Sequence, residues 1–189
     1  GTVLWWFKEF LDKIGHENAS LIMHTDPRDQ HGQDLHAMME ELDLVDGQVI
    51  LSTEKIDPVH LSMMYNLADC TINISDAEGF GLSTLESLSC ETPIIVNMTG
   101  GLQEQVTDGE EWFGIGIEPA SKAVIGSQLV PFIHEDRVSK EDFINSLEKM
   151  YSMFTEKPKE YRDLGKKGRE HVHKSYNFED YGKRWDKVF

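Results

Sequence analysis

Short continuous hydrophobic stretches alternate along the chain with segments in which apolar residues recur every three or four positions. The continuous stretches are typical of strands that are covered on both faces, and they span residues 19–25, 48–53, 70–75 and 92–98. Helical spacing predicts helices over residues 3–14, 34–44, 57–68, 82–90 and 102–106. Such alternation across short connections indicates βαβ units. We therefore predict an α/β fold class, with a Rossmann-like parallel sheet and helices on both faces.

The pattern changes in the second half of the chain. Residues 110–137 are rich in glycine and proline, and we expect one short strand near residues 113–117 followed by an irregular excursion. Capping signals at Ser139, Pro158 and Asn177 then predict a helical tail. We accordingly expect a Rossmann-like domain over residues 1–137 and C-terminal helices over residues 138–189 that pack on the same domain. Because doubly wound units normally begin with a strand, we expect a first strand upstream of Gly1.

Charge and cysteine content narrow the classes of partner. The chain has 34 acidic and 18 basic residues, a formal net charge of −16, so it should repel nucleic acid and anionic membranes. No apolar run approaches the roughly 20 residues of a transmembrane segment, and we predict none. Cys70 and Cys90 lie in apolar segments, as buried thiols do in a reducing compartment, which favours the cytoplasm.

The segment DAEGFGLSTLES, residues 76–87, places two carboxylates around a glycine-rich turn between a predicted strand and helix. The free N–H groups at the start of a helix attract an anion such as a phosphate. Glu78 and Glu86 would then flank that anion and accept hydrogen bonds from sugar hydroxyls. The plainer alternative is that Glu86 only complements the helix dipole and Glu78 is a solvated loop charge.

Residues 75–109 resemble the donor-site segment of retaining GT-B glycosyltransferases of family four. The two glutamates match the E-x7-E motif of that family, Gly100, Gly101 and Glu104 match a later turn, and residues 176–189 resemble the helix that closes the fold. The resemblance implies an enzyme that transfers a hexose-type sugar from a UDP- or GDP-sugar with retention of configuration. No cofactor and no obligatory metal are implied.

The resemblance also implies roles for individual residues. Glu86 would hold the ribose, and Glu78 would be the catalytic residue that contacts the transferred sugar. The sugar and diphosphate would lie against Gly79, Phe80, Gly81, Leu82 and Ser83. The rim of the base site is expected at Thr53, Lys55 and Ile56, and the second turn at Gly100 and Gly101.

The chain departs from the family pattern in four places. The Arg and Lys that contact the diphosphate in the family are expected upstream of Gly1, as is the N-terminal domain, which would be the partner that binds the acceptor. Glu91 stands where the family usually has glycine, and the excursion over residues 110–137 is longer than usual. We therefore expect this chain alone to be inactive and to bind nucleoside diphosphates weakly. Two alternatives stay open, namely a GT-B epimerase or phosphorylase and a non-catalytic interaction domain.

Overall fold

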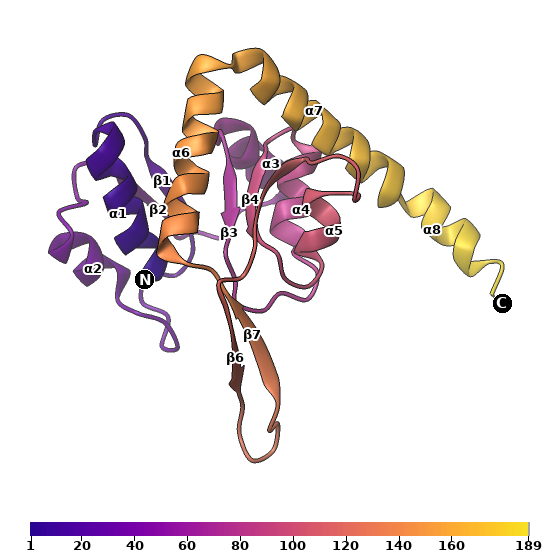
Figure 1. The fold of residues 1–189 in the computed structure, drawn as a ribbon, viewed down its shortest axis with the longest axis horizontal. Coiled ribbons are helices and arrows are strands. Elements are labelled where there is room, and N and C mark those ends of the chain that lie inside the picture. The colour runs from indigo at the N-terminus through magenta and orange to yellow at the C-terminus, as the bar shows by residue number, and fades with distance from the viewer. Residues whose placement is uncertain (189) are drawn as a thin grey trace. The chain divides into compact units, whose positions relative to one another are not determined.

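The computed structural model describes residues 1–188 and divides into two compact units, Gly1–Asp57 and Pro58–Phe189. Figure 1 shows the order of the helices and strands along the chain. The division after Asp57 differs from the boundary at residue 137 that the sequence predicts. The predicted boundary separates the sheet region from the helical tail, and it stays a prediction. The two units are described separately below.

The unit Gly1–Asp57 holds one parallel pair of strands and two helices. Its elements are α1 (Thr2–Ile14), β1 (Leu21–His24), α2 (Leu35–Glu41) and β2 (Val49–Ser52), and Leu21 of β1 lies opposite Val49 of β2. The buried face of α1 consists of Leu4, Phe7, Phe10 and Leu11, at the helical spacing that predicted this helix. The helix predicted over residues 34–44 ends earlier, at Glu41, because Asp43 takes a left-handed backbone conformation with φ 54°.

The unit Pro58–Phe189 is built around a three-stranded parallel sheet in the order β3-β4-β5. Its first elements are α3 (Pro58–Leu67), β3 (Thr71–Asn73), α4 (Leu82–Ser89), β4 (Ile94–Asn97), α5 (Leu102–Val106) and β5 (Gly114–Ile117). All four residues of the central strand β4 are buried. The α/β class with parallel strands is confirmed: β1 and β2 form one parallel sheet, and β3, β4 and β5 form another.

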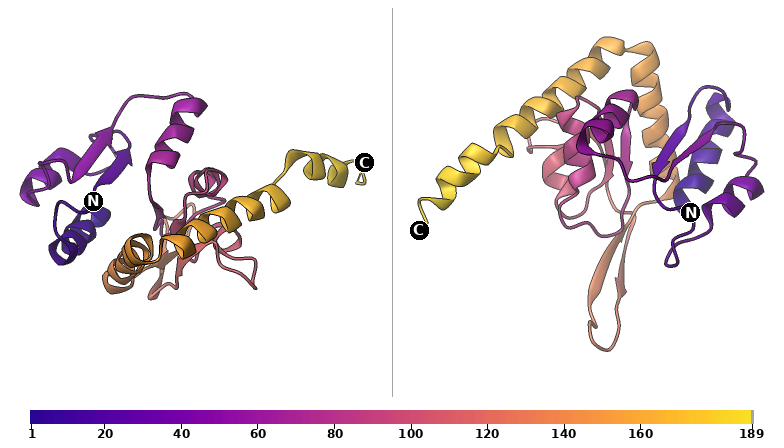
Figure 2. Two further views of the ribbon diagram at one scale, coloured as in Figure 1. Left: turned by 90° about the horizontal axis from the view of Figure 1, so that it is seen from above. Right: turned by 180° about the vertical axis from the view of Figure 1, so that it is seen from behind.

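The helical tail belongs to the second unit. It comprises α6 (Lys140–Glu156), α7 (Pro158–Ser175) and α8 (Phe178–Trp185), and the side chains of Ser139 and Asn177 cap α6 and α8 as predicted. Helix α6 contacts β5, and α7 contacts α4 and β5; Figure 2 shows the tail continuing from α6 through α7 to α8. Among residues 1–188, no helix is long and apolar enough to cross a membrane.

Glu91 lies where the end of α4 meets α7. This residue follows the end of α4 with φ 63°, the left-handed conformation that favours glycine. A Cβ at Gly165 of α7 would lie 2.1 Å from the Glu91 carbonyl oxygen, so α7 approaches the Glu91 backbone closely.

The two cysteines are less buried than the sequence suggested. Cys70 and Cys90 are free thiols that are half-buried, whereas the sequence suggested full burial.

The expectation of an irregular excursion within residues 110–137 is wrong. The strand β5 lies where it was expected, but β6 (Ser121–Ile125) and β7 (Ile133–Arg137) then form an antiparallel hairpin, with Ser121 opposite Arg137. Gly126 and Pro131 lie in the loop between the two strands, so they mark a turn and do not interrupt a strand. Figure 1 shows the hairpin projecting from the three-stranded sheet of its unit.

Candidate functional site

The turn that follows β3 carries the first glutamate and is held by the end of that strand. We call residues 75–81 the first turn. The Nδ2 group of Asn73 donates a hydrogen bond to Oε2 of Glu78 at 3.2 Å, and the backbone N–H of Ser75 donates to Oδ1 of Asn73 at 3.1 Å. Glu78 is half-buried. The Glu78 carboxylate is therefore oriented by the strand and does not extend freely into solvent, in contrast to the plainer alternative of a solvated loop charge.

The first turn leads directly into α4. Gly81 precedes the helix with φ 86°, a left-handed conformation that glycine adopts without strain. No side chain among residues 1–188 caps this helix, and Leu82 and Ser83 at its start are exposed. The N–H groups of a first helical turn have no carbonyl partner within the helix, so this end of α4 can receive an anion.

The second glutamate has a partner on α3. The hydroxyl of Tyr65 donates a hydrogen bond to Oε2 of Glu86 at 3.0 Å. Burial of the ring and this bond to a carboxylate both raise the pKa of Tyr65, so the phenol stays protonated and remains a donor. Glu86 is exposed and keeps further lone pairs for a ligand. Tyr65 thus fixes the direction of the Glu86 carboxylate on the outer face of α4.

The second turn packs against the backbone of the first. The N–H of Gly101 donates to the Gly79 carbonyl at 3.1 Å. A Cβ at Gly100 would lie 1.7 Å from the Glu78 carbonyl oxygen, and one at Gly101 would lie 2.7 Å from that of Phe80. The structure therefore brings the two predicted turns together, and the glycines of the second turn give the first turn its shape.

A buried glutamine fastens the same backbone from α5. Nε2 of Gln105 donates to the carbonyls of Phe80 at 2.6 Å and Gly81 at 3.1 Å. The Thr84 hydroxyl lies 2.6 Å from Oε1 of Gln105 and 2.9 Å from the Gly81 carbonyl, with one hydrogen to donate between them. Gln105 is fully buried, so its amide replaces the water that these carbonyls would otherwise need.

The comparisons with known proteins decide the family. Residues 16–171 match the family described as glycosyl transferases group 1, which covers most of the chain. The chain belongs to this family. Its fold is that of GT-B glycosyltransferases, so the resemblance is confirmed at the level of the family and the fold.

The curated relatives of this chain are longer proteins. The D-inositol 3-phosphate glycosyltransferase of Acidothermus cellulolyticus is 35% identical over 106 residues, which are 55% of this chain and 23% of that enzyme. The one from Streptosporangium roseum is 45% identical over 78 residues, or 41% of this chain and 18% of that enzyme. The matched part thus spans less than a quarter of either relative.

Solved structures share the fold at low sequence identity. The C-terminal domain of a glycosyl transferase group 1 family protein from Francisella tularensis superposes with a TM-score of 0.66 and 20% identity, covering 94% of this chain and 80% of that one. Anabaena HepE in complex with UDP-glucose superposes with a TM-score of 0.62 and 14% identity, covering 97% of this chain and 52% of that one.

The remaining predicted residues of this group 1 domain lie outside the two turns. Glu104 is exposed on α5, where its carbonyl accepts a hydrogen bond from Nε2 of His171 at 2.9 Å. Thr53, Lys55 and Ile56 follow β2 in the unit Gly1–Asp57; the first two are exposed and Ile56 is half-buried. Their assignment to the base rim stays a prediction.

Sequence reasoning missed Tyr65 and Gln105. Tyr65 is on the apolar face of a predicted helix, and a tyrosine at such a position predicts packing and not a polar contact. Gln105 is a polar residue on a five-residue helix, and no sequence feature at position 105 predicts a structural role for it. In both cases the relevant partner lies more than 20 residues away in the chain, at 21 residues for Tyr65 and Glu86 and 25 for Gln105 and Phe80.

Proposed function

We propose that this chain binds the nucleoside diphosphate sugar donor of a retaining glycosyltransferase that transfers a hexose-type sugar to an acceptor. The observation that carries this proposal is the arrangement of the first turn, where the uncapped start of α4 lies between Glu78 and Glu86. An anion site between two carboxylates suits a ligand whose phosphates are flanked by hydroxyl-bearing sugars.

Each part of the donor has a matching feature. The diphosphate is received by the backbone from Gly79 to Ser83, which attracts negative charge in an otherwise acidic chain. The ribose hydroxyls donate to Glu86, whose direction Tyr65 fixes. The hydroxyls of the transferred sugar donate to Glu78, which Asn73 orients. No step in this binding mode calls for a metal.

The comparisons support a nucleotide-sugar partner. Anabaena HepE, which shares the fold, forms complexes with UDP and with UDP-glucose. By analogy we propose a UDP- or GDP-sugar as the donor here. Cys70 and Cys90 are free thiols, as is usual in a reducing compartment, so we propose that the protein acts in the cytoplasm.

We further propose that an N-terminal GT-B domain supplies the acceptor site. The matched part of this chain spans 23% of the Acidothermus relative, so most of such an enzyme lies in other sequence. Helix α8 exposes Phe178 (84%) and Tyr181 (56%), which form an apolar surface suited to contact with another domain.

The exchange Glu78→Gln tests the proposal. A carboxylate binds sugar hydroxyls more strongly than a neutral amide, so we expect the affinity for UDP-glucose to fall about three- to tenfold. The affinity for UDP, which lacks the transferred sugar, should change by less than about twofold. NMR titrations of this chain measure both affinities. GDP and GDP-mannose serve as a second pair of nucleotide and nucleotide sugar.

Glu110→Gln is the matched control, because Glu110 is an exposed carboxylate outside both turns. This variant should retain both affinities. An equal loss of UDP and UDP-glucose binding in Glu78→Gln would give Glu78 a purely structural role and contradict its assignment to the sugar.

A further inference from the structure

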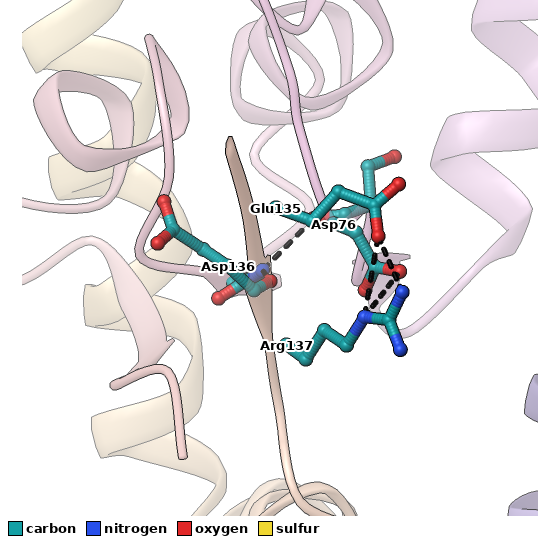
Figure 3. Close-up of polar contacts among 6 residues, drawn as sticks. Asp76, Glu135, Asp136 and Arg137 are labelled. Carbon is teal, nitrogen blue, oxygen red and sulfur yellow. Dashed lines mark hydrogen bonds and ion pairs between the residues drawn. The ribbon is translucent and has the colours of Figure 1, made fainter. Parts of the chain in front are cut away.

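The base of the β6–β7 hairpin meets the first turn directly. The backbone N–H of Asp136 in β7 donates to the carbonyl of Asp76 at 2.7 Å, and Figure 3 shows this contact from β7 to the turn. Asp76 lies two residues before Glu78, a span of at most about 7 Å of chain. A contact that fixes Asp76 therefore limits where Glu78 can move.

A buried asparagine at the end of β4 joins the same two segments. Nδ2 of Asn97 donates one hydrogen to the Ser75 carbonyl at 2.9 Å and the other to the Asp136 carbonyl. Asn97 is fully buried, and both of its donor hydrogens are used. The amide thus links the first turn and the hairpin base to the central strand of the sheet.

The side chains of β7 add charged contacts at this base. The Thr99 hydroxyl donates to Oδ2 of Asp136 at 2.9 Å, and Nζ of Lys122 lies 3.2 Å from Oδ1. The bond from Thr99, followed by that from Lys122, lowers the pKa of Asp136, so the carboxylate stays ionised at neutral pH.

Arg137 connects the hairpin to the turn by charge. Its Nη2 lies 2.6 Å from Oε2 of Glu135, and its Nε lies 3.8 Å from Oδ2 of Asp76 (Figure 3). Arg137 and Lys122 therefore offset the three carboxylates that meet here. Residues 76–80 of the first turn belong to no helix or strand, so these contacts supply order that regular secondary structure does not.

We propose that Asp136 is a positioning residue for Glu78 and that the hairpin base holds the first turn in its ligand-binding conformation. The identity of the ligand rests on the proposed function. Ordering a flexible segment on binding weakens affinity, so a turn that is ordered in advance binds more tightly. Asp136 acts through the first turn and does not itself contact the sugar.

Two variants of Asp136 test this proposal in the whole chain. Asp136→Leu removes the carboxylate that Thr99 and Lys122 hold, and with it the side-chain contacts that fix the residue-136 backbone against Asp76 and Asn97. Asp136→Asn keeps a carbonyl oxygen for the bond from Thr99. Ser127→Ala is the matched control in the hairpin loop, where the Ser127 hydroxyl accepts from the Val130 N–H. Amide hydrogen exchange and NMR titration with UDP and UDP-glucose give the readouts.

In Asp136→Leu we expect exchange within residues 75–81 to rise about tenfold, because local opening becomes easier. Binding of UDP-glucose should fall about three- to tenfold and that of UDP by less than about twofold. Asp136→Asn and Ser127→Ala should resemble the unsubstituted chain. Unchanged exchange in the first turn of Asp136→Leu would overturn the proposal.

The exchange measurement needs no ligand, which separates this proposal from the proposed function. Faster exchange in the first turn without any binding of nucleotides by the unsubstituted chain would contradict the proposed function and support the hairpin anchor. Faster exchange with an unchanged ratio of UDP-glucose to UDP affinity would overturn the positioning of Glu78.

Discussion

Replacing Gly100 by alanine is expected to lower the free energy of unfolding by about 2–5 kcal/mol. Gly100 has φ 51°, and a left-handed conformation costs an alanine about 1–2 kcal/mol. The added Cβ would also lie 1.7 Å from the Glu78 carbonyl oxygen, which forces the two turns apart. Such overpacking costs about 1–3 kcal/mol more. Urea denaturation of the variant and of the unsubstituted chain measures the difference.

Two other glycines separate these contributions. Gly109 has φ 94°, but a Cβ added there would meet no atom within 4 Å, so Gly109→Ala should show the conformational cost alone. Gly79 also has open space and no left-handed conformation, and Gly79→Ala should change stability by less than about 0.5 kcal/mol. If Gly100→Ala were no more destabilised than Gly109→Ala, the close packing of the two turns would be refuted.

Removing the second glutamate is expected to abolish most nucleotide binding. Glu86→Ala eliminates one or two charge-assisted hydrogen bonds to the ribose, which together contribute about 1.5–3 kcal/mol. The affinity for UDP should therefore fall by about 10- to 150-fold. Because we expect millimolar binding by the unsubstituted chain, the variant should show no saturation in an NMR titration.

Tyr65→Phe and Glu110→Ala serve as controls for this exchange. The first removes the hydroxyl that orients Glu86 and should weaken UDP binding by about two- to fivefold, since the carboxylate remains. The second removes an exposed carboxylate elsewhere and should have no effect. A Glu86→Ala variant that binds UDP as well as the unsubstituted chain does would disprove the ribose assignment.

The sequence predicted the α/β elements well because their patterns are local. The helical spacing of apolar residues in α1 and the continuous apolar run of β4 each come from one buried surface. Each pattern therefore lies within a single segment of the sequence. The β6–β7 hairpin was missed for the complementary reason. Neither β6 nor β7 contains a fully buried residue, so no alternation of polar and apolar residues marks the strands.

The candidate site likewise contains residues that local sequence patterns predict and residues that they do not. Glu78, Gly81 and Glu86 lie within nine consecutive residues, and their order along the chain predicts a turn with carboxylates on both sides. Asn97 and Gln105 reach that turn only through the folded chain, by single side-chain amides. A hydrogen bond between distant segments leaves no periodic signal, so sequence reasoning had no means to find these supports.

The central claim is that the start of α4 and its two flanking glutamates form a nucleotide-sugar site. Amide NMR spectra of this chain during titration with UDP-glucose, up to on the order of 10 mM, test it most directly. We expect the largest shifts to fall on Gly79 to Ser83 and on Glu86, and UDP to reproduce them with smaller changes at Glu78. Shifts confined to other segments, or none at all, would contradict this claim.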